Sequence, residues 1–280
     1  MLSYRHAFHA GNFADVLKHL VLLECLEYLK LKDKPFAYFD SHAGPGIYEL
    51  SSDFSQKNRE YETGITKLWD ESELPDALLR YRDLILAFNE SKQLSTYPGS
   101  PAIAARVLRP EDRLCLCELH TTEFEHLQSY FRSDRRAEVW KQDGFARINK
   151  QLPPRERRGL ILVDPPYELK EDYQRIVEFA KSAYRTFAQG VFLFWYPVVD
   201  RTRIDHMETA LRQSGIRNID LYELGVQADS KERGMTSSGM IVINPPWTLK
   251  KQIEPALEYL VPQLKTSEQA IYRAVTLVEE

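Results

Sequence analysis

Cysteine is scarce in this chain, which has three residues of this type, Cys25, Cys115 and Cys117. So small and odd a number argues against a disulfide framework and favours a reducing compartment. Long apolar runs are also missing: no stretch reaches the ~18 apolar residues that a membrane span needs. No apolar segment follows the first residues, as it would in a signal peptide. We therefore expect a cytoplasmic protein.

The chain also lacks an excess of charge of either sign. Its 37 lysines and arginines nearly balance 41 aspartates and glutamates, which gives a net charge of -4. This excludes a general attraction to nucleic acid, so such a partner would need a local basic patch. We expect no metal site, because His6, His9 and His19 have no cysteine or carboxylate at a recognised ligand spacing.

The composition is that of an ordinary globular protein: 280 residues, of which 43% are hydrophobic and 28% charged. Short apolar segments alternate with amphipathic ones, which predicts an α/β fold with a parallel sheet covered by helices on both faces. The first predicted helix covers 13–31, with Asn12 as its N-cap. The predicted strands cover 36–40, 113–118, 137–140, 159–163 and 191–196, followed by a closing pair at 219–226 and 239–243.

The connection between the first two predicted strands is much longer than an ordinary connection of about 12 residues. Part of it has apolar residues at helical spacing, beginning near Pro75. We interpret 48–100 as an inserted helical subdomain. Residues 1–47 then form an N-terminal segment and the first strand of the main domain, and residues 101–280 form the remainder of that domain.

Carboxylates follow four of the predicted strands: Asp40, Glu118, Asp143 and Asp164. The carboxyl ends of parallel strands meet at one edge of the sheet, and α/β proteins bind their ligands there. Carboxylates at this edge suit a ligand rich in hydroxyls and amines, such as a nucleoside.

The segment Asp164-Pro165-Pro166-Tyr167 directly follows a buried strand. An exocyclic adenine amine is a weak nucleophile because its lone pair is delocalised into the ring. The Asp164 carboxylate and the Pro165 carbonyl can accept hydrogen bonds from its two N–H groups and free that lone pair, while Tyr167 can stack on the base. The two prolines keep the loop rigid. A strand-ending turn is the simpler interpretation, but the place after a fourth apolar strand favours chemistry.

A second segment, Asn244-Pro245-Pro246-Trp247, has the same pattern. It follows the last predicted strand, far from the glycine turn at 44–46, and we interpret it as a strand-ending turn. Arginines are concentrated at 132–136 and 155–158. We expect the second group at the edge of the sheet opposite Asp164, because it precedes the strand that ends there.

The order of these motifs resembles that of S-adenosylmethionine-dependent methyltransferases that modify amino nitrogens. The N-terminal run from Tyr4 to His19, YRHAFHAGNFADVLKH, looks like the RlmJ family of bacterial 23S ribosomal RNA adenine-N6 methyltransferases. The resemblance covers essentially the whole chain, including the insertion. It implies a Rossmann-like class I methyltransferase fold with an inserted small helical subdomain, S-adenosyl-L-methionine as cofactor and 23S ribosomal RNA as partner. No exposed apolar helix stripe stands out, so we expect a monomer.

The resemblance also implies roles for particular residues. Asp164 would be the catalytic carboxylate. The residues that it places at the RNA substrate are Tyr4, Pro165 and Tyr167. Glu118 would bind the ribose hydroxyls of the cofactor. The residues that it places around the rest of the cofactor are His19, His42, Ser100, Asp143 and Gly144, the last two beside its adenine.

Two other functions stay open on the residues alone. The same chemistry could act on an adenine of DNA or on a side-chain amide nitrogen of a protein, and competition between RNA and DNA would separate these substrates. A non-catalytic RNA-binding scaffold could share the fold, although the intact segment 164–167 argues against it.

Overall fold

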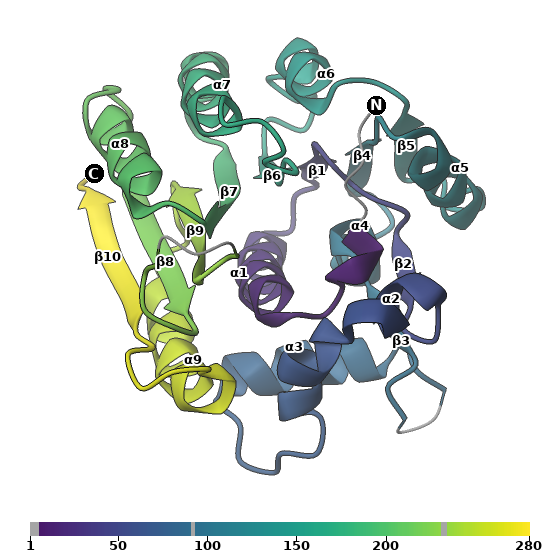
Figure 1. Ribbon diagram of the computed structural model, residues 1–280. Coiled ribbons are helices and arrows are strands. Elements are labelled where there is room, and N and C mark those ends of the chain that lie inside the picture. Colours follow the sequence, from purple (N-terminus) through teal and green to yellow (C-terminus); the bar gives the residue numbers. More distant parts are fainter. Residues whose placement is uncertain (1–5, 91–92, 231–233) are drawn as a thin grey trace.

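The computed structural model describes residues 6–90, 93–230 and 234–280 (Figure 1). The strands of its main sheet are β1 (Ala37–Asp40), β4 (Arg113–Cys117), β5 (Ala137–Trp140), β6 (Gly159–Val163), β7 (Val191–Val198), β8 (Ile219–Gly225), β9 (Ser237–Ile243) and β10 (Tyr272–Val278). They lie in the order β10-β8-β9-β7-β6-β1-β4-β5. Strands β7, β6, β1, β4 and β5 are parallel to one another. Strand β9 pairs antiparallel with both β7 and β8, and β10 pairs antiparallel with β8. A separate small sheet joins β2 (Ile47–Glu49) to β3 (Thr96–Pro98).

Helices cover both faces of the main sheet (Figure 1). On one face lie α1 (Phe13–Lys30), α3 (Asp76–Leu86), α4 (Ser100–Val107) and α9 (Leu249–Leu264). On the other lie α6 (Gly144–Gln151), α7 (Asp172–Thr186) and α8 (Arg201–Arg212). Successive residues of a strand alternate between the two cores: Tyr38 joins the first and Phe39 the second. Both faces are apolar, which explains why the parallel strands have continuous apolar sequences.

The structure confirms the predicted α/β class and the position of each predicted strand to within a few residues. The closing pair is antiparallel, and Asn12 caps α1 by accepting the backbone N–H groups of Ala14 and Asp15. The edge strand β10 was not predicted. Of the residues of β10, all of which the structure describes, Leu277 alone is buried. The strand therefore lacks the continuous apolar sequence by which the other strands were predicted.

Residues 48–100 contain α2 (Asp53–Asn58), two 3-10 helices, Glu60–Thr63 and Ile65–Leu68, and α3. The side chains of Leu68, Leu78 and Tyr81 are fully buried in the same core as those of α1. The segment therefore forms one wall of the core around α1. The division of the chain at residues 48 and 100 stays a prediction. Beyond the insertion, α5 (Thr121–Tyr130) packs beside β5.

The antiparallel direction of β9 places the second proline segment at the edge opposite Asp164. There the Asn244 side-chain amide donates hydrogen bonds to the carbonyl oxygens of Ala188 and Gly190, which closes a strand-ending turn. Arg158 lies at this edge too, donating to the carbonyl oxygens of Leu29 and Lys34. The segment 244–247 and Arg158 therefore both have structural roles at this edge of the sheet.

All three cysteines are buried free thiols, so the predicted absence of a disulfide framework is confirmed. Across the ranges given above, none of the helices has the length and apolar character needed to cross a membrane.

Candidate active site

A pocket opens at the carboxyl edge of the parallel strands, next to α1. Its walls come from the turn at 41–45 after β1, from 118–120 after β4, from 143–144 after β5 and from 164–169 after β6. Lys18 and His19 of α1 close one side. Three of the four predicted strand-end carboxylates line it directly. This is where the topology of a parallel α/β sheet places a ligand.

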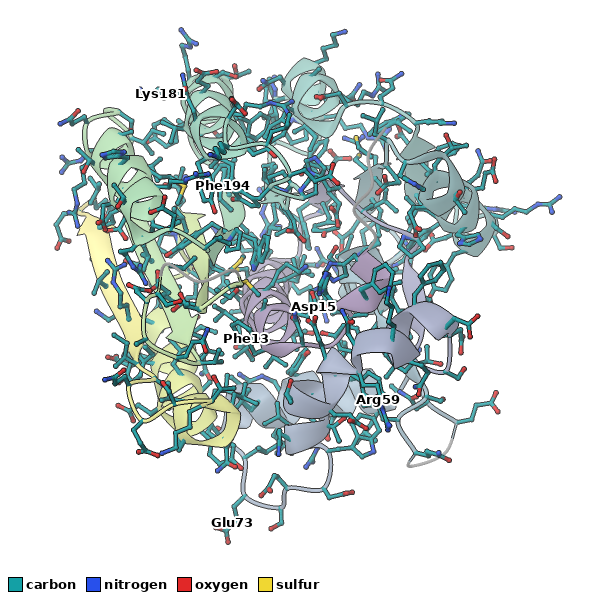
Figure 2. All side chains as sticks on the ribbon, in the orientation of Figure 1. Phe13, Asp15, Arg59, Glu73, Lys181 and Phe194 are labelled. Carbon is teal, nitrogen blue, oxygen red and sulfur yellow. The ribbon has the colours of Figure 1, made fainter. Side chains whose placement is uncertain are left out.

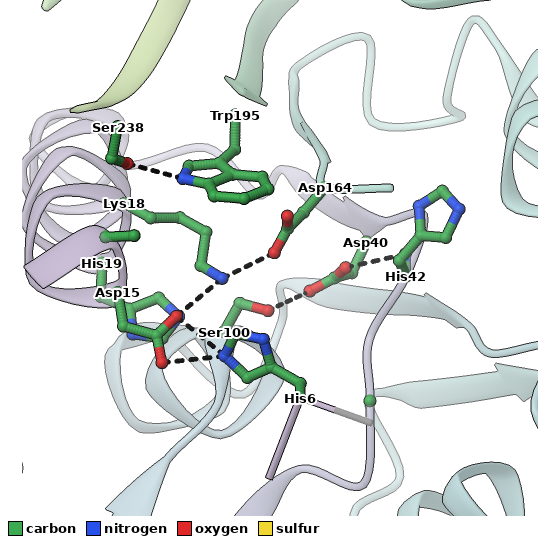
Figure 3. A network of polar contacts seen from close by, with 12 residues as sticks. His6, Asp15, Lys18, His19, Asp40, His42, Ser100, Asp164, Trp195 and Ser238 are labelled. Atoms are coloured by element: carbon green, nitrogen blue, oxygen red, sulfur yellow. Dashed lines mark hydrogen bonds and ion pairs between the residues drawn. The ribbon is translucent and has the colours of Figure 1, made fainter. Parts of the chain in front are cut away.

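Lys18 lies between two carboxylates in this pocket (Figure 3). Its Nζ is 2.6 Å from Oδ2 of Asp164 and 2.8 Å from Oδ1 of Asp15, and its side chain is only 4% exposed. Burial favours the neutral amine, but the two carboxylates outweigh this effect and raise the pKa of Lys18. The ring of Trp195 lies 5.6 Å from the ammonium group. A fixed positive charge therefore holds Asp164.

Asp15 connects this lysine to the N-terminal segment. Its carboxylate accepts the backbone N–H of Gly11 at 2.9 Å and lies 2.9 Å from Nε2 of His6. Burial opposes ionisation, but His6 and Lys18 lower the pKa of Asp15 well below its usual value. Asp15 thus remains charged and fixes Lys18 and the His6 ring beside the pocket.

Two predicted cofactor residues are histidines that line the pocket in their neutral form. His19 Nδ1 is 2.7 Å from the Tyr97 hydroxyl, and His42 Nδ1 is 2.7 Å from Ser41 Oγ. Burial lowers the pKa of His19 to about 3 and that of His42 to about 4. Neither ring repels a cationic ligand at neutral pH.

Asp40 supports the pocket from below. Its fully buried carboxylate accepts hydrogen bonds from the hydroxyls of Ser100 and Tyr38, each at 2.7 Å. Burial raises the pKa of Asp40 to about 6. Ser100, which lines the pocket as predicted for a cofactor residue, is thereby held in a single orientation.

Glu118 and Asp143 both line the pocket and both organise local backbone. Glu118 accepts the N–H groups of Gly44 at 2.8 Å and His120 at 2.7 Å, and burial raises its pKa. Asp143 caps α6 by accepting the Ala146 N–H at 2.9 Å, and it pairs with Arg175 at 3.1 Å. These bonds fix two carboxylates where a ligand's hydroxyls and amines can reach them.

Of the residues predicted to contact the substrate, Pro165 lines the pocket, whereas Tyr167 packs against neighbouring aromatic residues. Pro165 lines the pocket beside Asp164. Tyr167 has a φ of 51°, an uncommon conformation for a bulky residue. Its hydroxyl donates to the Trp195 carbonyl oxygen, and its ring packs 4.6 Å from that of Tyr173. Stacking of Tyr167 on a base stays a prediction, and Tyr4 lies outside the described residues.

The sequence analysis did not place His6, Asp15 and Lys18 around Asp164. One signal for the last two was present in the sequence: apolar residues occupy most positions of 13–30, around most of the helix. In the structure, 14 of the 18 residues of α1 are buried. A charged pair three residues apart on such a helix cannot be an ordinary solvated pair. What the sequence could not supply was the third partner, since Asp164 is 146 residues further along the chain.

The hydrogen-bond acceptors of the pocket fit S-adenosylmethionine, which carries a positive sulfonium, an ammonium group and an adenosine. The carboxylates of Glu118 and Asp143 can accept hydrogen bonds from its hydroxyls and amines. The buried Phe145 ring packs edge-on against the His42 ring at 5.5 Å and so supports this wall of the pocket from the core. Within the described ranges, no group of three or more His, Cys, Asp or Glu side chains is arranged to hold a metal.

At Gly144, two backbone segments of the pocket wall approach each other so closely that there is no room for a side chain. A Cβ at this position would lie 2.1 Å from the Ser41 carbonyl oxygen and 2.6 Å from Ser41 Cα, so backbone would have to move. We expect Gly144→Ala to weaken S-adenosylmethionine binding at least tenfold and to destabilise the fold by about 1–3 kcal/mol. Calorimetric titration and urea unfolding measure both effects. The control for backbone strain alone is Gly215→Ala, outside the pocket lining, where the φ of 80° strains an alanine but its Cβ meets no atom within 4 Å. Equal cofactor affinity in the two variants would contradict the expectation.

Comparison with known proteins identifies the family. Residues 33–277 match the family model described as ribosomal RNA large subunit methyltransferase D, RlmJ. The chain is 51% identical to ribosomal RNA large subunit methyltransferase J of Escherichia coli (strain K12) and 50% identical to that of Haemophilus influenzae (strain ATCC 51907 / DSM 11121 / KW20 / Rd), each over 94% of both chains. The crystal structure of protein LPL1258 from Legionella pneumophila is 39% identical, with a TM-score of 0.89 over 96% of this chain and 98% of that one.

Matches of this extent confirm the resemblance seen in the sequence. The family model covers all the pocket-lining segments that follow β1 in the sequence. The LPL1258 structure has the same fold along nearly the full length of the chain. The chain belongs to the RlmJ family of ribosomal RNA large subunit methyltransferases, enzymes of the Rossmann-like class I fold that use S-adenosylmethionine.

Proposed function

We propose that this chain transfers the methyl group of S-adenosylmethionine to the N6 amine of an adenine in 23S ribosomal RNA. The observation that carries the proposal is the Asp164 carboxylate, held by the buried Lys18 in a pocket whose hydrogen-bond acceptors fit that cofactor. The names of the relatives support RNA as the substrate. The residues that we assign to cofactor binding are His19, His42, Ser100, Glu118, Asp143 and Gly144.

In the proposed mechanism, Asp164 orients the target amine. Lys18 contacts Oδ2 of Asp164, which leaves Oδ1 to accept one N–H of the amine. The Pro165 carbonyl would accept the other N–H. Together these acceptors draw the nitrogen toward a tetrahedral geometry, which reduces the delocalisation of its lone pair into the ring and makes the amine more nucleophilic. S-adenosylmethionine, when bound, supplies an electrophilic methyl carbon with a good leaving group.

Asp164 would also receive the proton that methyl transfer releases. A carboxylate, whose ordinary pKa is about 4, is too weak a base to deprotonate a neutral amine. It can accept a proton from the cationic amine formed by the transfer. Positioning and polarisation, rather than prior deprotonation, therefore account for the chemistry that these residues perform.

The wider assignments follow from this activity. We infer a monomer that acts in the cytoplasm, where 23S RNA is modified, with residues 48–100 as an inserted helical subdomain. The target adenine must leave its helix or loop to reach the pocket, which extends from the surface inward to the buried Lys18.

A competition assay tests the choice of substrate. Unmodified 23S RNA and an adenine-containing DNA duplex would be mixed in equal amounts with the protein and methyl-labelled S-adenosylmethionine. We expect the label in RNA. Preferential labelling of DNA would overturn the proposed substrate, and cofactor binding without any transfer would favour the RNA-binding scaffold.

A further inference from the structure

A groove between α7 and α8 begins where the catalytic loop ends. Lys170 and Tyr173 line its start, whereas Leu169 and Asp172, their neighbours in the chain, line the active-site pocket. The groove holds about 480 Å³, within the range of roughly 300–1,000 Å³ that is typical of ligand-binding clefts. A ligand in the pocket can therefore continue into the groove without leaving the protein surface.

The charge of this groove is opposite to that of the whole chain. Three permanent cations line it, and Glu178 is the carboxylate among its lining residues. That carboxylate already accepts a hydrogen bond from Gln174 at 2.8 Å. Lys170 and Lys181 are exposed, and neither has an ion-pair partner in the described part of the chain; Figure 2 marks Lys181 on α7. Arg203 pairs with Asp200 at the groove mouth.

The floor of the groove is closed and apolar. Tyr173, Val177 and Met207 are each at most 8% exposed, and they pack α7 against α8. The Tyr173 hydroxyl is fixed by the Pro197 carbonyl oxygen at 2.9 Å. The eight helical residues from Gln174 to Lys181 extend the groove by about 10 Å, since seven rises of ~1.5 Å separate the first from the last. Its shape is thus a shallow track with cations on both rims.

We propose that this groove binds the sugar–phosphate backbone of the RNA strand that flanks the target adenosine, an inference that rests on the proposed function. A strand whose adenine enters the pocket must place its neighbouring phosphates near the catalytic loop, and the groove is the cationic path that starts there. Flexible lysines suit phosphates because they neutralise charge without reading the base. The chain with net charge -4 thereby gains a local attraction for RNA.

The double variant Lys170→Gln/Lys181→Gln tests the groove. We expect its KM for unmodified 23S RNA to rise roughly tenfold at 0.15 M salt, with kcat and cofactor affinity unchanged. Each lost phosphate contact should reduce the slope of log affinity against log salt by about one. The control is Lys32→Gln/Lys250→Gln, which removes the same charge from two exposed lysines away from the groove. The control should behave like the wild type.

Several outcomes would overturn the groove assignment. One is a double variant whose KM and salt slope equal those of the control. Another is a fall in kcat at unchanged KM, which would mean that these lysines act on the catalytic loop instead. A third outcome combines two measurements: the wild type and the double variant bind RNA equally well, and polyglutamate displaces RNA from the wild type alone. That result would assign the groove to an acidic protein. If the wild type does not methylate RNA, the proposed function fails, and RNA-binding salt slopes still decide the groove.

Discussion

Replacing Asp164 by alanine is expected to abolish methyl transfer while S-adenosylmethionine still binds. The carboxylate is the group that we assign to the target amine, and its loss removes both the acceptor and the later proton acceptor. Positioned groups of this kind contribute about 10²–10⁴-fold to a rate. The cofactor residues lie on other strand ends and do not depend on Asp164 for their bonds. Single-turnover transfer and calorimetric cofactor titration measure the two properties separately.

A more conservative variant sharpens this test. Asp164→Asn keeps the shape of the side chain and one carbonyl oxygen, but it removes the charge that pairs with Lys18. We expect at least a 100-fold loss of kcat in this variant too. Asp205→Ala, at an exposed position of α8, is the control and should retain full activity. A folded Asp164→Ala protein that fails to bind cofactor would contradict the division of roles between Asp164 and the cofactor residues.

Lys18→Met is expected to cost both stability and activity. Methionine has a similar length, but it leaves Asp15, at 1% exposure, without its closest cation and frees Asp164 to turn. Removing one partner of a buried ion pair costs about 3–5 kcal/mol, because the other charge stays buried and uncompensated. Misplacement of a reacting group by about 1 Å can cost 100-fold in rate. Urea unfolding and single-turnover kinetics measure these losses.

Two further variants separate the charge of Lys18 from its geometry. Lys18→Arg keeps the positive charge and should recover most of the stability, although its planar fork fits the two carboxylates differently and should recover less of the rate. The double variant Lys18→Met/Asp164→Asn should be less destabilised than the two single effects added together, since the charge left unpaired by one change is removed by the other. Strict additivity, or a Lys18→Met protein with wild-type stability, would contradict the ion-pair network.

The parallel half of the fold could be predicted from the sequence because its physical signals are local. Strands such as Gly159–Val163 are buried on both faces and are therefore continuously apolar. Four of the five parallel strands, β1, β4, β5 and β6, end at or shortly before a carboxylate, and the topology brings those ends together. The segment 244–247 could be recognised as different because it follows the last predicted strand, far from the glycine turn. The structure adds that its strand runs antiparallel to β7. The edge strand β10 lacked such a signal.

The arrangement around Asp164 could be predicted only in part. The sequence identified the carboxylate and the loop that carries it, but not the lysine that holds it, since Lys18 reaches Asp164 only after α1 packs against the sheet. Tyr167 shows the same limit. Its type predicts stacking on a base, and this stays a prediction; the sequence did not show that its hydroxyl and ring contact Trp195 and Tyr173. Tertiary contacts decide where such a side chain points.

Nucleoside mass spectrometry tests the central claim most directly. Unmodified 23S RNA would be incubated with the protein and S-adenosylmethionine, digested to nucleosides and compared with the same RNA treated with the Asp164→Ala variant. The account predicts N6-methyladenosine with the wild type and none with the variant. Methylation of another nucleoside, or N6-methyladenosine in equal amount with both proteins, would contradict it.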